Sequence, residues 1–458
     1  MVYKECNLRA VVYKVQTFGT TQERNEWKRA LRYTQRVSSM SFRGFLADLK
    51  KEGLLKEVHE PVSPLLEVTD RAWGKGPILF NNVDGHKCCL NILGTRSLLA
   101  RALGISGKDM VTHLAGIGYE GPVREVDSSP FMECASMPDL SLLPILTHFK
   151  GDGGPYITSA VVVSQFEGKL NACVHRLMVL GRDRLAVRLV PGRHTHQFYQ
   201  AAFAKGEEVP VAIAIGVDPL LLMAASTRVP PEKEFSYAAA LRGSPVELVR
   251  LDNGVLSPHA EIVLEGYITG ERASEGPFVD ITGTCDLIRQ EPVIRLTRMM
   301  TREDPIYHGL LPAGGEHKML MGVPYEPLIY KAVSKVAKVK NVILTDGGCN
   351  YFHAVVQIEK ETEEDARRAI EAAMQAHGSV KHVLVVDTDI DIYDPRDLEF
   401  AIATRMRADE DLVIHPNVRG STLDPRSKEG ITTKVGVDAT ARLDRLWKFQ
   451  RVTPKGQG

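Results

Sequence analysis

Residues 169–181, KLNACVHRLMVLG, decide how the middle of the chain is interpreted. Leu, Val and Ala give this run the composition of a β-strand, and a glycine ends it. Asn171, His175 and Arg176 interrupt it. Because an arginine in an apolar strand is costly to bury without an anion, Arg176 either faces outward or meets a carboxylate or phosphate in a pocket.

Strand-like runs of the same kind fill the region from about residue 156 to residue 300. Each is rich in Val and Ile and is bounded by Gly, Pro or Asp. The other six are ITSAVVVSQ, RLAVRLVP, VPVAIAIGV, VELVRL, AEIVLEGYI and PVIRLTRMM. With one helix, HQFYQAAFAKG, the seven runs predict a barrel-like antiparallel core.

The segments on either side alternate between helical and strand-like patterns. PILFNNV and CCLNILG favour strands and SLLARALGI a helix, whereas TEEDARRAIEAAMQA and PRDLEFAIATRMR favour helices beside the strand KHVLVVDTD. The predicted fold class is α/β (α+β), with an α/β domain over 40–125, a β-barrel domain over 126–315 and an α/β domain over 316–458. We expect the tail from residue 411 to be rich in loops.

The first 39 residues differ from the rest in being polar and weakly periodic. We interpret residues 1–39 as a disordered extension. Phe42, Phe45, Leu46 and Leu49 then recur at helical spacing behind Ser41, which can cap a helix. Met40 is therefore the expected start of the folded part.

Composition narrows the class of protein further. The chain of 458 residues has 57 basic and 57 acidic side chains, which gives no electrostatic reason to expect nucleic acid or an anionic membrane as partner. No apolar run reaches the roughly 18 residues of a membrane span, and the N-terminus lacks a secretory signal pattern. The seven cysteines contain no CxxC, which argues against a zinc ribbon or a disulfide framework. We expect a cytoplasmic protein.

A second informative stretch is residues 274–283, SEGPFVDITG. Glu275 and Asp280 lie on either side of Gly276 and Pro277, a pair typical of a turn. The two acids are either solvated turn residues or neighbours in a dry pocket, where one of them keeps its proton.

Two further stretches carry polar residues at predicted helix starts. Arg188, Arg193, His194 and His196 cluster where a strand meets a helix, which suits a phosphate, although two histidines one residue apart are more often a surface pair than a metal site. Glu234 lies at a helix start, where the helix dipole favours an acid. No GxGxxG after a strand, P-loop, HExxH or GxSxG is present.

Together these stretches resemble the UbiD-type decarboxylases, which use prenylated flavin mononucleotide. The resemblance covers about residues 41–425. Five stretches carry it by their order and spacing: NACVHR, RLVPGRHTH, EFSYAAALRG, EIVLEG followed by EGPFVD, and DTDIDIYDPRDLEFAIATRM. It implies a central split β-barrel like that of flavin reductases and a C-terminal domain used in oligomer contacts.

The resemblance also implies roles for particular residues. The catalytic trio would be Arg176, Glu275 and Asp280. The ligands of Mn²⁺ or Mg²⁺ at the cofactor phosphate would be Asn171, His194 and Glu234, and K⁺ is a further expected ion. The residues expected to contact the cofactor are Val174, His175, Arg176, Arg188, Leu189, Val190, Arg193 and His194. Many relatives have Gly where this chain has Val279, so the pocket wall differs.

The implied reaction is a reversible, non-oxidative decarboxylation of a small unsaturated acid. EGPFVDITGTCD is most similar to the archaeal branch that would convert trans-anhydromevalonate 5-phosphate to isopentenyl phosphate, and an aromatic or heteroaromatic acid such as a hydroxybenzoate is the alternative substrate. A flavin prenyltransferase would supply the cofactor, and a homodimer or higher homo-oligomer is expected. From another class, a flavin reductase or flavin-binding module stays open, as does a non-catalytic assembly subunit, against which the intact trio argues.

Overall fold

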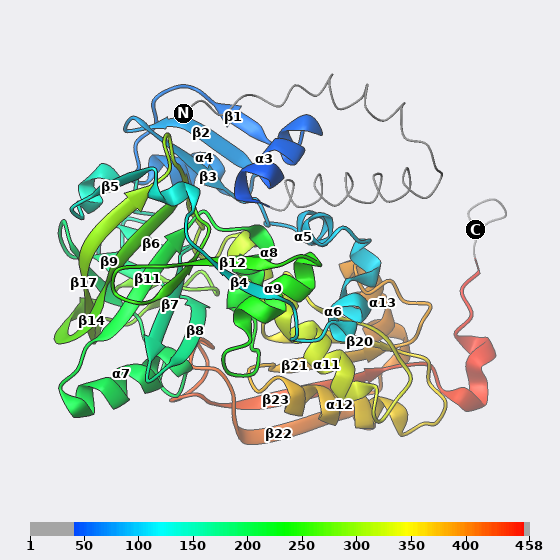
Figure 1. The fold of residues 1–458 in the computed structure, drawn as a ribbon. Coiled ribbons are helices and arrows are strands. Elements are labelled where there is room, and N and C mark those ends of the chain that lie inside the picture. The colour runs from blue at the N-terminus through cyan, green and yellow to red at the C-terminus, as the bar shows by residue number, and fades with distance from the viewer. Residues whose placement is uncertain (1–40, 453–458) are drawn as a thin grey trace, which may run out of the picture.

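A nine-stranded antiparallel sheet, called the central sheet because the middle of the chain forms it, lies at the left of the molecule in Figure 1. The computed structural model describes residues 41–452, so the expected extension at residues 1–39 lies outside the described part. The strand order is β6-β9-β10-β17-β14-β11-β7-β8, and β5 also pairs with β17. Because β6 and β8 do not pair with each other, the sheet stays open, as a split barrel does. Its strands are β5 (Cys134–Ser136), β6 (Tyr156–Ile157), β7 (Val161–Phe166), β8 (Lys169–Val174), β9 (Leu177–Val179), β10 (Arg184–Val187), β11 (Val209–Ile215), β14 (Ile262–Glu275) and β17 (Arg289–Thr301).

The run KLNACVHRLMVLG is not one strand, as the sequence suggested, but two. β8 ends at Val174 and β9 begins at Leu177, which leaves His175 and Arg176 in the break between them. Within a strand, successive side chains must point to opposite faces of the sheet, but two residues beyond a strand end are not held to this alternation. Both residues can therefore turn toward the same site.

One of the helices that cover the sheet was not foreseen. The helix expected at HQFYQAAFAKG is α7 (His194–Lys205) and the helix expected to start at Glu234 is α9 (Glu234–Arg242), but no helix was expected at α8 (Pro219–Ser226). α8 is buried on nearly every side, and a helix that is apolar all round has no periodicity to detect. The run VELVRL also joins a separate small sheet, β13-β12-β4, with β4 (Val123–Val126), β12 (Val246–Arg250) and β13 (Leu256–Pro258).

The N-terminal part packs beside the central sheet (Figure 1). Ser41 caps its first described helix by accepting the Gly44 N–H at 3.0 Å, as expected. The sheet order is β1-β2-β3-β18, and β18 comes from the far end of the central region, so the two parts are interwoven. Its elements are α3 (Phe42–Lys51), β1 (Lys56–Val58), α4 (Glu67–Ala72), β2 (Ile78–Val83), β3 (His86–Leu90), α5 (Arg96–Leu103), α6 (Met110–Gly116) and β18 (Ile306–His308).

The C-terminal part is built on a five-stranded sheet of order β19-β20-β21-β23-β22. The expectation of a loop-rich tail after residue 411 is wrong, because β22 and β23 pair with each other and β23 pairs with the buried strand β21. Its elements are α10 (Gly315–Gly322), α11 (Glu326–Val333), β19 (Val339–Leu344), β20 (His353–Ile358), α12 (Asp365–Ala376), β21 (His382–Val386), α13 (Pro395–Arg405), β22 (Leu412–Arg419) and β23 (Ile431–Ala439). The boundaries at 125 and 315 stay predictions.

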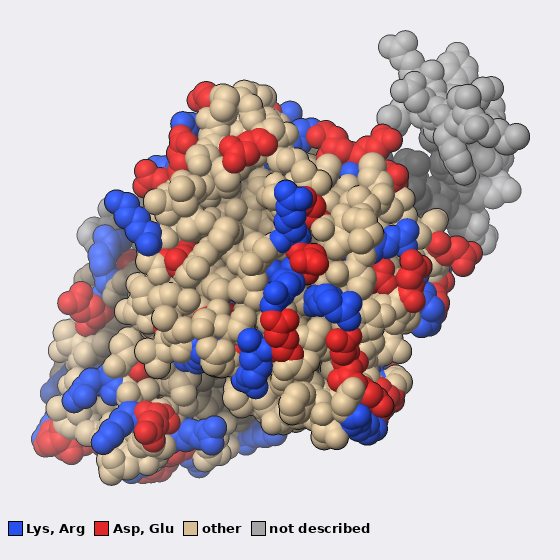
Figure 2. Space-filling view, turned by 90° about the vertical axis from the view of Figure 1, so that its left-hand side faces the viewer, with Lys and Arg blue, Asp and Glu red and all other residues tan. Residues whose placement is uncertain are grey.

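The surface carries both signs of charge. On the face drawn in Figure 2, Lys and Arg side chains lie interspersed with Asp and Glu rather than in one basic field. Within the described part of the chain, no helix is both long and apolar enough to cross a membrane.

Candidate active site

Arg176 is the centre of the candidate site, and three carboxylates contact its guanidinium. Nε and Nη2 donate to Glu275 Oε1 and Oε2, both at 2.9 Å. Nη1 donates to Asp280 Oδ2 at 3.2 Å, and Nη2 also donates to Asp286 Oδ2 at 3.0 Å. The structure thus brings the three sequence-predicted residues of the trio together and adds Asp286, which the sequence analysis did not single out.

Burial sets the electrostatics of this cluster. Burial alone would lower the pKa of Arg176, but Glu275, Asp280 and Asp286 raise it, so the guanidinium stays charged. The Glu275 side chain is fully buried and also accepts the Tyr156 hydroxyl at 3.2 Å. A bidentate arginine–carboxylate pair in such a setting is both strong and directional. Glu275 therefore holds the arginine plane in one orientation.

Phe278 completes the cage around the arginine. The centre of its ring lies 4.7 Å from the Arg176 guanidinium carbon, and the ring packs against Tyr156 at 4.6 Å between centroids. An aromatic face near a guanidinium attracts the cation and excludes water.

Asp280 follows the short strand β15 (Phe278–Val279), which pairs with β16 (Cys285–Asp286). Its Oδ1 accepts the Ile281 N–H at 2.6 Å, which leaves Oδ2 toward Arg176. His317, half-buried at the start of α10, lies near Asp280, and burial lowers its pKa while the charge of Asp280 opposes that shift. One carboxylate oxygen of Asp280, Oδ1, is thus held by the backbone, and the other, Oδ2, points toward Arg176.

A second cluster forms where α7 and α9 begin beside β8. His194 Nδ1 lies 3.0 Å from Asn171 Oδ1 and 4.0 Å from Glu234 Oε1. Burial raises the pKa of Glu234 to about 7, and within residues 41–452 no lysine or arginine pairs with it. A buried carboxylate beside an amide oxygen and an imidazole suits a divalent cation such as Mn²⁺ or Mg²⁺.

His196, two residues beyond His194, lies outside this cluster. His196 is only half-buried and accepts the Gly192 N–H at 3.4 Å, so it does not join the cluster. Across the described residues, no three His, Cys, Asp or Glu side chains gather closely enough to hold a metal. A metal at this place therefore needs the amide of Asn171.

The residues expected to contact the cofactor have the following positions. His175 is buried, with Nδ1 3.0 Å from the Arg188 carbonyl oxygen and Nε2 3.2 Å from Thr195 Oγ1. Arg188 donates to Glu291 at 2.7 Å, and the Leu189 N–H donates to the same carboxylate at 3.3 Å. The others are Val174, which is half-buried, and Val190 and Arg193, which are exposed. Cationic and apolar groups beside the cluster of Asn171, His194 and Glu234 are of the kinds that suit a flavin phosphate and ring.

Several contacting residues were missed by the sequence analysis: Tyr156, Cys173, Thr195, Phe278 as a ring over Arg176, Asp286, Arg289 and His317. Cys173, Thr195, Phe278 and Asp286 had a signal, since they lie within the stretches NACVHR, RLVPGRHTH and EGPFVDITGTCD. Tyr156, Arg289 and His317 lie on β6, β17 and α10, outside those stretches, and only folding brings them to the site.

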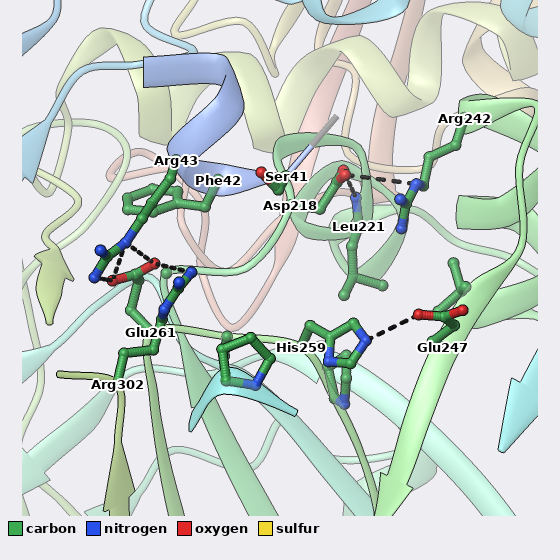
Figure 3. Close-up of a pocket in the computed structure, with 15 residues that line it drawn as sticks. Ser41, Phe42, Arg43, Asp218, Leu221, Arg242, Glu247, His259, Glu261 and Arg302 are labelled. Carbon is green, nitrogen blue, oxygen red and sulfur yellow. Dashed lines mark hydrogen bonds and ion pairs between the residues drawn. The ribbon is translucent and has the colours of Figure 1, made fainter. Parts of the chain in front are cut away.

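A separate pocket lies at the other end of β14, next to α3 (Figure 3). Glu261 accepts three bonds from Arg43, the shortest at 2.7 Å, and lies 3.5 Å from Arg302, while His259 lies 3.1 Å from Glu247. The pair between Arg43 and Glu261 joins α3 to the start of β14. None of the trio lines this pocket, so it is distinct from the candidate active site.

The fold and this site define an enzyme of the carboxy-lyase class, and three family models match consecutive parts of the chain. They describe the N-terminal, Rift-related and C-terminal domains of 3-octaprenyl-4-hydroxybenzoate carboxy-lyase and match residues 46–117, 124–315 and 318–439. The chain belongs to the UbiD family.

Individual relatives are consistent with this family. The anhydromevalonate phosphate decarboxylase of Methanosarcina mazei is 56% identical over 90% of this chain and 99% of its own length. The solved structure of the UbiD-class enzyme HmfF from Pelotomaculum thermopropionicum with FMN is 37% identical, with a TM-score of 0.88 over 91% of this chain and 98% of that one. An evolved dimeric form of HmfF with prFMN has a TM-score of 0.84 at 36% identity, over 92% and 98% of the two chains.

Proposed function

We propose that this protein is a prenylated-FMN-dependent decarboxylase that converts trans-anhydromevalonate 5-phosphate to isopentenyl phosphate and CO₂. The observation that carries the reaction class is the Arg176 guanidinium held by Glu275 and Asp280 at the open end of the central sheet. The 56% identity to a relative named for this activity supports the substrate.

Arg176 binds and orients the substrate carboxylate in this proposal. A guanidinium has five N–H groups, and Glu275, Asp280 and Asp286 use four of them. The remaining N–H, on Nη1, is available to the substrate beside Asp280. Glu275 fixes the guanidinium plane, because both of its oxygens are engaged by Arg176.

Asp280 supplies the proton. The bond between the α-carbon and the carboxyl carbon breaks and CO₂ leaves, while bound prenylated FMN would supply the sink for the electron pair left behind. Asp280 then gives its proton to the carbon that lost CO₂, and the new C–H bond completes the product. Solvent returns a proton to Asp280, so the enzyme is unchanged.

Asn171, His194 and Glu234 would hold Mn²⁺ or Mg²⁺ against the cofactor phosphate, with K⁺ as a further ion. Support comes from the buried carboxylate of Glu234, with which no lysine or arginine of residues 41–452 pairs. A flavin prenyltransferase would supply the cofactor, and the protein would act as a homodimer or higher homo-oligomer. A cytoplasmic location stays a prediction.

The test is co-expression with a flavin prenyltransferase, followed by assay of CO₂ release from trans-anhydromevalonate 5-phosphate and from hydroxybenzoates. We expect the phosphorylated substrate to react, and turnover in deuterated water to place one deuterium at the carbon that lost CO₂. Release of CO₂ from the aromatic acids alone would contradict the assigned substrate. NAD(P)H oxidation without CO₂ release would favour a flavin reductase.

Asp280→Asn is the decisive variant, because it keeps size and shape but cannot donate a proton at neutral pH. Removal of a positioned general acid costs about 10²–10⁴-fold in rate, and cofactor content should not change. Glu275→Gln should lower the rate and weaken substrate binding as well. Asp252→Asn, at an exposed ion pair with Arg298, is the matched control and should behave like the parent. A parental rate in Asp280→Asn with full cofactor would refute the assignment.

A further inference from the structure

Asp286 is a third carboxylate on Arg176, beyond the trio. The β15–β16 pairing places Asp286 opposite Phe278, so one hairpin carries Asp280 at the end of its first strand and Asp286 in its second. Arg176 Nη2 carries two hydrogens. One is donated to Glu275, and the other is donated to Asp286 Oδ2 at an N···O distance of 3.0 Å. The hairpin thus brings two carboxylates to opposite ends of one guanidinium.

Arg289 holds Asp286 in place. Its Nη2 lies 2.7 Å from Asp286 Oδ1 and its Nη1 lies 2.6 Å from Asp286 Oδ2, which makes a bidentate pair. The Leu287 N–H donates to Oδ1 at 2.8 Å. Burial alone would raise the pKa of Asp286, but Arg289, the Leu287 N–H and Arg176 outweigh burial and lower it. Asp286 is therefore a fixed anion at neutral pH.

The charge count around Arg176 follows from these contacts. Glu275, Asp280 and Asp286 face two guanidiniums, those of Arg176 and Arg289. With Asp280 protonated the cluster is neutral. With Asp280 ionised it carries one excess negative charge in a partly buried place, which is unfavourable.

We infer that Asp286 is a positioning residue that keeps the proton on Asp280 by occupying Arg176, and that Arg289 limits the strength of this effect. The inference rests on the proposed role of Asp280 as the proton donor. Without the charge of Asp286, the cluster would be neutral with Asp280 ionised, and Arg176 would favour that form. Without Arg289, the excess negative charge would be larger.

The other charged or titratable groups near Asp280 do not change this count of charges around Arg176. His317 on α10 is kept neutral because burial lowers its pKa, and the Lys318 ammonium lies 3.4 Å from Asp346. Burial and the Glu275 charge raise the pKa of Tyr156, so it stays a neutral donor. Burial also raises the pKa of Asp152, which lies behind the turn. Arg188 and Glu291 form a pair of their own.

The two neighbours of Asp280 should act in opposite directions. Asp286→Asn keeps the shape of the side chain but removes its charge, so the alkaline fall in decarboxylation rate should move to lower pH by about one unit. Arg289→Gln should move it to higher pH. The double variant Asp286→Asn with Arg289→Gln should return close to the parent, since it removes one charge of each sign. A merely structural role would slow all three variants without moving their profiles apart.

The experiment records the pH dependence of turnover for the cofactor-loaded parent and these variants. Asp252→Asn and Arg298→Gln, which break an exposed ion pair that includes another residue of β17, are matched controls and should leave the profile in place. Shifts of opposite sign support the inference. Equal shifts, or none, overturn it.

A second measurement separates this inference from the proposed function. Difference infrared spectra between the protein and its Asp280→Asn variant report the protonated carboxyl of Asp280 directly, with no need for turnover. The midpoint of that signal should move down in Asp286→Asn and up in Arg289→Gln. If no acid is decarboxylated yet the midpoints move, the function fails and the electrostatic link stands. If CO₂ is released but the midpoints stay fixed, the inference fails and the function stands.

Discussion

Gly153 and Gly276 are in backbone contact: a Cβ placed on Gly153 would lie 2.2 Å from the carbonyl oxygen of Gly276. The Gly153 N–H donates to the carbonyl oxygen of Pro277 at 2.8 Å. Gly153 thus holds the turn at Gly276 and Pro277, between Glu275 and Asp280, through its backbone. The loop before β6 thus determines where both acids of the trio lie.

Gly153→Ala should therefore displace the turn. Overpacking of this kind typically costs about 1–3 kcal/mol, and a small shift of Asp280 should lower the rate by more than about tenfold. The measurements are melting temperature and decarboxylation rate. Gly154→Ala is the control, because its added Cβ would meet neighbours at an ordinary 3.8 Å. Equal behaviour of the two variants would contradict this account of the turn.

Glu234→Ala and Asn171→Ala should each lose bound metal and retain less cofactor. Loss of outer-shell groups alone costs about 10–100-fold in metal affinity, so removal of a direct ligand should cost at least as much. Metal analysis and mass spectrometry of the purified proteins give both contents. Glu247→Ala, at an exposed acid on β12, should match the parent. Unchanged Mn²⁺ and cofactor in the first two variants would remove them from the metal site.

His148 should make the protein less stable in acid. Only 2% of His148 is exposed, neither ring nitrogen has a hydrogen-bond partner among the described residues, and burial lowers its pKa to about 3. The unfolded chain takes up this proton below about pH 6.5 and the folded protein does not, so stability falls as pH drops from about 6.5 toward 3.

His148→Leu removes this contribution. Between about pH 6.5 and pH 5 the parent should lose about 2 kcal/mol more than the variant. Melting temperatures over a pH series measure the difference, and His113→Leu on the exposed face of α6 is the control. His353 and His377, whose pKa values burial also lowers, will keep part of the acid dependence. An unchanged slope in His148→Leu would show that His148 does not couple to folding.

Arg405 should be a structural residue. Its side chain is 2% exposed, and it pairs with Asp387 and, at 2.6 Å, with Asp389. Arg405→Ala leaves those acids without their cation and should cost about 3–5 kcal/mol, with little change in rate for protein that has folded and loaded cofactor. Arg407→Ala, which breaks an exposed pair with Asp409, should be nearly neutral. A selective loss of rate in folded Arg405→Ala would contradict this.

The sequence alone identified the features that depend on local chemistry. Ser41 before an apolar helical stripe predicted α3, and the Val- and Ile-rich runs predicted most strands of the central sheet, because caps and alternation are read from adjacent residues. The resemblance carried by NACVHR and EGPFVD implied Arg176, Glu275 and Asp280 as a trio, and the structure brings these three residues into contact.

Tertiary structure alone decided what those residues touch. Arg176 is 99 positions from Glu275 and 110 from Asp286, so their contacts depend on strand pairing across the sheet. α8 escaped detection because it is buried all round, and β22 and β23 did because their pairing, with each other and of β23 with β21, forms only in the folded sheet. Asp286 and Arg289 were not singled out from the sequence. Their effect on Asp280 arises only because folding places them in a partly buried cluster, where charges interact far more strongly than in water.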